Sequence, residues 1–335
     1  MISRSFAAVL MMMGLVGCNS NTSSNGSANQ NSNTDTKTSV ATSTTTSTFD
    51  TSKKIMAYTR DTTSGTRDGF FTKIGMSSAK ADNTPLVSGY VEVSSNGDMV
   101  NRIKEDTYGI GYISLSSLDT TALTGLKFNN VEPTEDNVLN NTYGLTRNFN
   151  YIIRNDYDAD SKVGKIVEAF VAYMSTTDAK AIIKSNDGIL TISASDKSWD
   201  DIKANYPICN EDNSSIKVAF GGSTSVEKIA KKLTAAFTKL CGNFVAEHNH
   251  TGSGDAYKHT QGAQKDAATG KLDVGFLSRE LESNEAAADG TSGKICTDAI
   301  VAVVNKNNPL KSTDAQTLVD IYNGTKTLWN QVIVA

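Results

Sequence analysis

Short apolar segments alternate along the chain with longer segments in which apolar residues recur at every third or fourth position. Residues 54–58 and 216–220 are short and apolar, and a polar turn follows each of them. Residues 166–174 and 226–240 show the spacing that marks the buried face of a helix, and residues 299–304 are apolar enough for a buried strand. Strands that alternate with amphipathic helices predict an α/β fold with mainly parallel sheets.

The first 18 residues have the pattern of a signal peptide. Arg4 precedes an uncharged, largely apolar run over residues 5–17, which is shorter than the ~20 apolar residues that a membrane-spanning helix needs. The run ends in Leu-Val-Gly-Cys at 15–18, which resembles the lipobox of bacterial lipoproteins. We therefore expect an extracytoplasmic lipoprotein that is acylated (palmitate) at Cys18 and anchored to the cell membrane.

Residues 19–50 are dominated by Ser, Thr and Asn and contain a single aromatic residue, Phe49. Such a segment cannot bury a hydrophobic core, so we expect a disordered tether. The remaining residues, 51–335, suffice for one large domain or for two lobes.

Charge and cysteine content exclude some classes of function. The chain has 32 basic and 36 acidic residues, a net charge of −4, and no basic stripe, which argues against a nucleic-acid partner. A net-acidic protein must bind an anion locally, through helix N-termini, backbone amides and a few arginines. The four cysteines form no disulfide framework and no C-x-x-C metal motif. If Cys18 is acylated, at most one disulfide can form, and apolar neighbours favour buried thiols for Cys241 and Cys296.

Four hydroxyl-rich turns have the composition of oxyanion sites. Residues 221–226, Gly-Gly-Ser-Thr-Ser-Val, open a helix whose first amides have no intrahelical partner and favour an anion. Residues 60–67, Arg-Asp-Thr-Thr-Ser-Gly-Thr-Arg, add hydroxyl donors, a glycine that permits close approach, and an arginine suited to tetrahedral oxyanions. Residues 251–254 and 273–280 are the other two. Each turn alone is also compatible with ordinary helix capping or a plain loop, and only their number favours a binding site.

Together these turns resemble the motifs of the phosphate-specific substrate-binding proteins of the phosphate ABC importer. The resemblance covers nearly all of the chain from Lys54 onwards. The matching segments are R-x-x-x-S-G-T-R at 60–67, I-G-Y-I at 110–113, Y-G-L-T-R at 143–147, G-S-T-S-V at 222–226, T-G-S-G at 251–254, D-V-G-F-L-S-R-E at 273–280, D-A-I-V-A-V-V-N-K-N-N-P at 298–309 and L-V-D-I-Y-N-G at 318–324.

The resemblance implies a periplasmic-binding-protein-like fold of two α/β lobes, joined by two crossing strands and closing on the ligand by hinge bending. In the family the G-S-T-S-V motif lies near the N-terminus, whereas here it follows R-x-x-x-S-G-T-R. We therefore expect a circular permutation, with a fragment of a tandem protein as the alternative. Lobe A would comprise residues 151–292, and lobe B would be assembled from residues 51–150 and 293–335.

The resemblance also implies a function and a site. The function is capture of inorganic phosphate by a monomer and its delivery to the membrane permease subunits of an ABC importer, with no enzymatic activity, cofactor or metal. Ser278 and Arg279 stand where some members have an aspartate that accepts the proton of hydrogen phosphate. This departure weakens the rejection of sulfate, and an arginine adds attraction for any dianion. The remaining expected phosphate contacts are Thr224, Ser225 and Ser253 on one lobe and Arg60, Ser64, Gly65 and Thr66 on the other.

Other functions stay open at this point. A binding protein for sulfate or molybdate, or a phosphate sensor or adhesin of the same fold, would have similar motifs. His248 and His250 share a strand face, so a zinc-binding or hydrolytic protein that also uses His259 or Glu247 is a further hypothesis. Residues 290–294 lack the spacing of a P-loop.

Overall fold

The computed structural model describes residues 49–333. The predicted signal peptide, Cys18 and almost all of the predicted tether lie outside the described residues. Within residues 49–333, no helix combines the length and the apolar character needed to cross a membrane.

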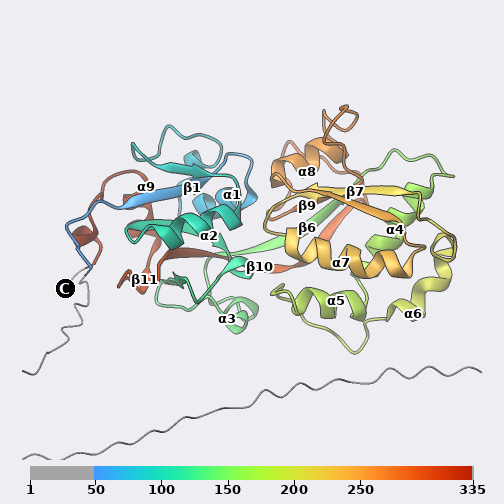
Figure 1. Cartoon of the computed structure of the whole chain (residues 1–335), viewed down its shortest axis with the longest axis horizontal. Helices are drawn as coiled ribbons and strands as arrows, with labels where there is room; N and C mark the ends of the chain where they lie inside the picture. The colour runs from blue at the N-terminus through green and yellow to red at the C-terminus, as the bar shows by residue number, and fades with distance from the viewer. Residues whose placement is uncertain (1–48, 334–335) are drawn as a thin grey trace, which may run out of the picture. The chain divides into compact units, whose positions relative to one another are not determined.

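The described residues form two groups of helices and strands that two long strands connect (Figure 1). One group, which we call lobe B, contains β1 (Met56–Arg60), α1 (Gly65–Lys73), β2 (Val91–Val93), α2 (Asn96–Glu105), β3 (Gly109–Ser114), β4 (Leu123–Gly125), β5 (Lys127–Phe128), α3 (Glu135–Leu139), β11 (Ser312–Thr313) and α9 (Ala315–Tyr322). The other group, lobe A, contains α4 (Lys162–Met174), α5 (Thr177–Lys184), α6 (Trp199–Ile202), β7 (Lys217–Gly222), α7 (Glu227–Leu240), β8 (Val245–Asn249), α8 (Ser253–Thr260) and β9 (Val274–Leu277).

The connecting strands are β6 (Thr146–Ile153) and β10 (Ser292–Asn305), which pair with each other in antiparallel register. The C-terminal part of β10 pairs with β3 of lobe B, whereas the C-terminal part of β6 pairs with β9 of lobe A. The exact residues at which one lobe gives way to the other, predicted at 150/151 and 292/293, fall within these strands and stay a prediction.

One mixed sheet runs through both lobes in the order β2-β1-β3-β10-β6-β9-β7-β8, and β4 also pairs with β10. The pairs β1/β2, β1/β3, β7/β8 and β7/β9 are parallel, and every pair that includes β6 or β10 is antiparallel. The α/β class and the two crossings are therefore confirmed. The prediction of mainly parallel sheets holds for those strand pairs of this sheet that include neither β6 nor β10.

Each lobe has its own hydrophobic core. In lobe B, Phe70 of α1 stacks on Tyr112 of β3 with ring centroids 4.0 Å apart, and Trp329 is fully buried in the same cluster. In lobe A, α7 buries the apolar face that its sequence spacing predicts, including Leu233 and Phe237. Each such side chain contributes about 1.5–3 kcal/mol to stability. The main cores of the two lobes are separate from each other, and each lobe contains one smaller buried cluster besides.

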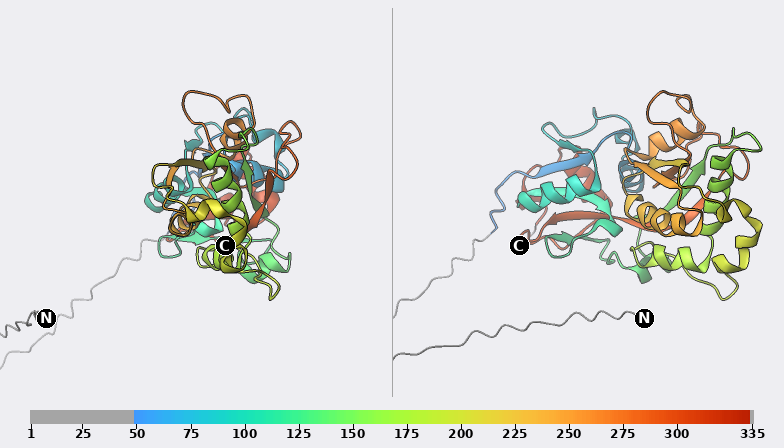
Figure 2. Two further views of the ribbon diagram at one scale, coloured as in Figure 1. Left: turned by 90° about the vertical axis from the view of Figure 1, so that its right-hand side faces the viewer. Right: turned by 45° about the vertical axis from the view of Figure 1, so that its right-hand side comes forward.

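The two ends of the described chain lie side by side in lobe B (Figure 2). Asn330 N donates a hydrogen bond to Thr51 O at 2.7 Å, and Lys54 forms a bridge with Leu328. The permutation hypothesis requires such proximity, because a chain opened at one surface point has neighbouring ends.

The cysteines differ in part from the sequence interpretation. Cys241, at the end of α7, forms a disulfide with Cys209, so the interpretation of Cys241 as a buried thiol is wrong. The physical reason is that the short 3-10 turn Pro207–Asn210 folds back against this end of the helix, which sequence spacing alone does not reveal. Cys296 is a buried free thiol, as expected.

Candidate functional site

Four helices begin in the same region between the lobes. In lobe B, Ser64 caps the start of α1 and Ser95 caps the start of α2. In lobe A, α7 and α8 begin after the turns at 222–226 and 251–252. Thr66 and Asn96 from lobe B both reach Ser225 of lobe A. The first amides of a helix lack intrahelical partners and its dipole is positive there, so this arrangement favours an anion.

Ser225 is the centre of the contacts between the lobes. Its Oγ accepts hydrogen bonds from Asn96 Nδ2 at 2.9 Å and Arg147 Nη2 at 3.1 Å, and it lies 2.8 Å from Thr66 Oγ1. A hydroxyl has one hydrogen and two acceptor positions. Because both acceptor positions are used, Ser225 donates to Thr66, and the hydroxyl hydrogen of Thr66 remains available to a further acceptor.

Three more serines form a second hydroxyl chain, at the lobe A side. Ser223 Oγ donates to Ser278 Oγ at 2.8 Å, and Ser278 Oγ lies 3.2 Å from Ser253 Oγ. Because Ser278 Oγ accepts from Ser223, its own hydrogen can be donated to Ser253 Oγ. The hydroxyl hydrogen of Ser253, like that of Thr66, then remains available to a further acceptor. Gly65 of lobe B faces this chain: a Cβ added there would lie 2.7 Å from Ser278 Oγ and still closer to Ser253 Oγ. Only glycine permits this approach.

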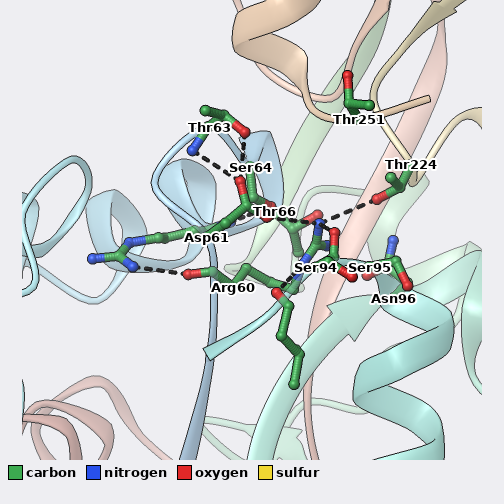
Figure 3. A network of polar contacts seen from close by, with 12 residues as sticks. Arg60, Asp61, Thr63, Ser64, Thr66, Ser94, Ser95, Asn96, Thr224 and Thr251 are labelled. Atoms are coloured by element: carbon green, nitrogen blue, oxygen red, sulfur yellow. Dashed lines mark hydrogen bonds and ion pairs between the residues drawn. The ribbon is translucent and has the colours of Figure 1, made fainter. Parts of the chain in front are cut away.

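Arg60, the last residue of β1, is fully buried beside these hydroxyls (Figure 3). Its Nε donates to Val93 O at 3.2 Å, and its Nη2 donates to Ser94 O at 2.8 Å and to Thr224 Oγ1 at 3.2 Å. Burial lowers the pKa of the guanidinium, but arginine stays protonated in proteins. Nη1 is buried and has no hydrogen-bond partner within residues 49–333.

Arg147 is the second buried arginine and lies on crossing strand β6, opposite Asp298 of β10. Its Nε donates to Asp298 Oδ2 at 2.9 Å, and Ser114 Oγ lies 2.9 Å from both carboxylate oxygens, which share its one hydrogen. Burial raises the pKa of Asp298, and Arg147 opposes this change. Arg147 Nη1, like that of Arg60, is buried without a partner in the described part of the chain. Buried polar groups without partners are rare, so both nitrogens lack the acceptor that such groups normally have.

The structure thus brings together most of the residues predicted from sequence. Arg60, Gly65 and Thr66 of lobe B meet residues of lobe A, and Ser64 is buried beside them as the cap of α1. The lobe A members of this cluster are Thr224, Ser225, Ser253 and Ser278.

Arg279 is the predicted residue that the structure does not bring into the cluster. Its Nη1 and Nη2 donate to the two carboxylate oxygens of Glu285 at 2.6 and 2.8 Å. A bidentate pair of this kind holds the guanidinium in place and offsets its charge. The expected attraction of Arg279 for a dianion is therefore reduced.

Sequence reasoning also missed four residues of the site, namely Asn96, Arg147, Ser223 and Asp298. Ser223 precedes Thr224 in the same hydroxyl run, so its position alone was a usable signal. Asp298 directly precedes the apolar run 299–304, and a buried charge requires a partner. Asn96 had no comparable signal, because asparagine at a helix start is common.

Two cavities flank the cluster. One, of about 440 Å³, is lined by Arg147, Ser278, Lys73 and Lys294 among others. The other, of about 430 Å³, is lined by Ser64 and by residues of α8 and the loop after β9. Each cavity shares residues with the cluster, so both cavities lie beside it.

The histidines of β8 and its end are engaged in hydrogen bonds. His248 Nδ1 lies 3.1 Å from His250 Nε2, and His250 Nδ1 lies 3.1 Å from Ser223 O. His248 Nε2 contacts Thr234 of α7 at 2.9 Å, and Glu247 pairs with Lys217. Among residues 49–333, no three His, Cys, Asp or Glu side chains are grouped to hold a metal ion. The zinc hypothesis therefore gains no support from the contacts of these residues.

Comparisons with known proteins agree with the fold and with the motifs. Residues 209–335 match the PBP superfamily domain. The chain is 27% identical over 278 residues to "Phosphate-binding protein PstS 2" of Streptococcus agalactiae, which covers 82% of this chain and 86% of that protein. The protein of the same name from Streptococcus pneumoniae is 27% identical over 285 residues, with coverages of 84% and 88%.

A solved structure has the same fold. It is a phosphate-binding protein of a phosphate ABC transporter from Streptococcus pneumoniae, and it superposes with a TM-score of 0.60 and 24% sequence identity over 84% of this chain and all of that chain. The relatives are named as binding proteins rather than enzymes, in agreement with the prediction that this chain is not an enzyme. The chain is therefore a relative of the PstS-type phosphate-binding proteins and has the fold of the periplasmic-binding-protein superfamily.

Proposed function

We propose that this protein captures inorganic phosphate between its two lobes and delivers it to the permease subunits of an ABC importer in the membrane. It acts as a monomer and needs no cofactor. The hydroxyl groups, guanidiniums and helix N-termini of the cluster bind the ligand, and the crossing strands β6 and β10 act as the hinge. The names of its relatives support phosphate as the ligand.

One observation carries this proposal. Donors from both lobes meet at Thr224 and Ser225, and two buried guanidinium nitrogens of the same arginines, Arg60 Nη1 and Arg147 Nη1, have no partner among residues 49–333. A tetrahedral oxyanion with four oxygens can accept from both, from the hydroxyls of Thr66 and Ser253, and from helix amides. The same contacts connect the lobes, so ligand binding stabilises the closed form.

Calorimetry with phosphate tests the proposal directly. We expect Arg60→Ala to weaken phosphate binding by about 100-fold or more, because hydrogen bonds from a charged donor contribute about 1.5–3 kcal/mol each. Ser64→Ala is expected to weaken binding as well. Arg102→Ala is the control, because Arg102 is exposed and its one ion pair among residues 49–333 is with Asp98 on the same helix. A wild-type protein that binds no phosphate contradicts the function, and unchanged affinity in both site variants contradicts the site.

Sulfate and molybdate belong in the same experiment as competitors. Binding of either with higher affinity than phosphate would make the protein a binding protein for that oxyanion. The contacts of the cluster would keep their roles, because all these ions are tetrahedral acceptors.

The lipid anchor is a separate part of the proposal, and it rests on the sequence around Cys18. We expect the wild-type protein in the membrane fraction outside the cytoplasm, and Cys18→Ser in the soluble extracytoplasmic fraction. An unchanged distribution of Cys18→Ser would contradict acylation at this residue. The phosphate experiment does not depend on this result.

A further inference from the structure

A row of four polar groups runs from helix α7 to the turn at 222–226. Thr234 Oγ1 lies 2.9 Å from His248 Nε2, and His248 Nδ1 lies 3.1 Å from His250 Nε2. His250 Nδ1 in turn lies 3.1 Å from Ser223 O. We call these four groups the histidine row. The row ends at a turn of the proposed phosphate site, so its role in ligand binding rests on the proposed function.

One carbonyl fixes where the hydrogens of the histidine row lie. Ser223 O can only accept, so His250 Nδ1 carries a hydrogen and donates it. In neutral His250 the other nitrogen, Nε2, is then an acceptor, so His248 Nδ1 donates to it. Neutral His248 accepts at Nε2 from Thr234 Oγ1. Both imidazoles therefore have their hydrogen on Nδ1, and the neutral row has one arrangement.

The histidine row also has a place for one additional proton. Thr234 Oγ1 lies 3.0 Å from Ala230 O of its own helix. When His248 Nε2 takes up a proton and donates to Thr234 Oγ1, the threonine hydrogen turns to this carbonyl, and each contact has one hydrogen. A second proton, on His250 Nε2, would place two N–H groups face to face, with their nitrogens 3.1 Å apart. The row therefore binds one proton without moving its heavy atoms.

The surroundings of the histidine row disfavour a charge. Burial, and then the charge of His250, lower the pKa of His248 to about 4, and burial lowers the pKa of His250. Within residues 49–333, the charged groups that face the row are Glu227 and Lys231 of α7, which pair with each other at 2.6 Å. The rings that stack on the imidazoles from β7 and β9 are phenylalanines. An anion bound nearby is therefore the charge that would favour protonation of the row.

The histidine row ends on the peptide group that joins Ser223 to Thr224. A trans peptide directs its C=O and N–H to opposite sides, and no cis peptide bond occurs within residues 49–333. The N–H of Thr224 thus points away from His250, and it makes no hydrogen bond to the described part of the chain. Thr224 Oγ1 accepts from Arg60 of the other lobe (Figure 3). The unused amide therefore belongs to a residue at which the two lobes meet.

We propose that His250 is a positioning residue of the phosphate site, which holds the Ser223–Thr224 peptide group so that the Thr224 amide donates to the bound oxyanion. The hydrogen bond to Ser223 O also polarises this peptide group, which makes its N–H a stronger donor. His248 and Thr234 fix the tautomer of His250 and provide the place for one proton. Because an anion at the amide favours a positive charge on the row, phosphate and this proton each raise the affinity for the other.

Calorimetry with phosphate on the full chain in detergent, at pH 7.5 and pH 5.5, tests both parts of the proposal. H250A removes the contact to Ser223 O, so we expect an affinity about three- to tenfold lower at pH 7.5. H250N places an amide nitrogen at the position of Nδ1 but takes up no proton, so its affinity at pH 7.5 should stay within about twofold of the wild type. From pH 7.5 to pH 5.5 the ratio of wild-type to H250N affinity should rise at least about threefold. The ionisation of phosphate itself cancels in this ratio.

H259N is the matched control, because His259 lies on α8 of the same lobe and outside the histidine row. Its affinity and its pH dependence should equal those of the wild type. An H250A affinity equal to that of the wild type at pH 7.5 overturns the positioning role of His250. A ratio of wild-type to H250N affinity that is the same at both pH values overturns the coupling to a proton.

The tautomers of the wild type provide a second test, which stays available if H250A fails to fold. Nitrogen-15 NMR of labelled histidines should show the hydrogen on Nδ1 of both His248 and His250 at pH 7.5. A hydrogen on Nε2 of His250 instead overturns the proposal, because His250 could then not donate to Ser223 O. This spectrum requires no ligand, whereas a wild type that binds no phosphate overturns the proposed function, so the two failures are distinguishable.

Discussion

At the scale of residues, the site depends on two guanidiniums whose burial costs desolvation free energy. A buried charge is tolerated only if it is paired and hydrogen-bonded. Arg147 Nη2 lies 2.8 Å from Asp298 Oδ2, whereas Arg60 Nη2 is farther, 3.4 Å, from Asp61 Oδ2, and Arg60 donates mainly to the carbonyls of Val93 and Ser94. The two arginines therefore differ in what they stabilise: Arg147 belongs to an ion pair of the crossing strands, and Arg60 has more of its charge left for a ligand.

This difference leads to a prediction for Arg147. Arg147→Met leaves Asp298 buried without its cation, so we expect a loss of about 3–5 kcal/mol in the free energy of unfolding. Arg147→Met with Asp298→Asn should recover at least half of that loss, because asparagine still bonds to Ser114 without a charge. Urea unfolding measures both. Phosphate binding should be weakened in both variants, and equal stability of the single and double variants would contradict the pairing argument.

The histidine pair predicts a dependence of stability on pH. Burial, and then the charge of His250, lower the pKa of His248 to about 4, and burial lowers the pKa of His250. In the unfolded chain both are expected near ~6.5. The unfolded state therefore binds more protons below pH ~6.5, and stability falls as the pH drops from there towards the folded values.

Urea unfolding at pH 7, 6 and 5 measures this effect. His248→Gln removes one of the two groups, so its free energy of unfolding should decrease less than that of the wild type over this range. Carboxylates titrate mainly below pH 5 and affect both proteins equally. Parallel pH profiles would refute the assignment of the effect to His248.

At the scale of elements, the sequence predicts the strand, turn and helix units but not their partners. The apolar spacing of 226–240 predicted α7, and the hydroxyl turns at 60–67 and 222–226 were expected at one site. The pairing of Arg279 with Glu285 was not predictable, because it depends on how the loop after β9 folds back. The acceptor contacts of Ser225 likewise depend on two lobes closing, and no local pattern encodes the distance between segments far apart in sequence.

The disulfide gives a prediction at this scale. It closes a loop with a sequence separation of 32 and joins the C-terminal end of α7 to the turn at Pro207–Asn210. Cys209→Ser with Cys241→Ser should reduce the free energy of unfolding by about 2–4 kcal/mol. Phosphate affinity should not change, because a helix of 14 residues separates this end from the site by about 21 Å. A large loss of affinity in a folded variant would show that α7 transmits strain to the site.

At the scale of the whole molecule, we expect the packing of the segments, rather than their order along the chain, to determine the fold. The sheet order β2-β1-β3-β10-β6-β9-β7-β8 interleaves early and late strands, and both ends of the described chain lie in lobe B. The relatives match over 82–84% of this chain and 86–88% of their own length, which is expected if they share its order of motifs. The permutation itself stays a proposal about descent, and its physical basis can be tested in this protein.

The test is a rearranged chain in which residues 333 and 49 are joined by a short Gly-Ser linker. New ends are opened between Ser214 and Ser215, which are exposed and precede β7. Because Phe49 packs on Trp329 with ring centroids 5.7 Å apart, the linker spans neighbouring segments and should not strain the fold. We expect this chain to fold and to bind phosphate within about threefold of the wild-type affinity. A matched chain opened between Phe220 and Gly221 breaks β7 beside the site and should fail to bind. If the first chain also fails to fold, the packing of the two lobes depends on chain order, and the permutation proposal loses its physical support.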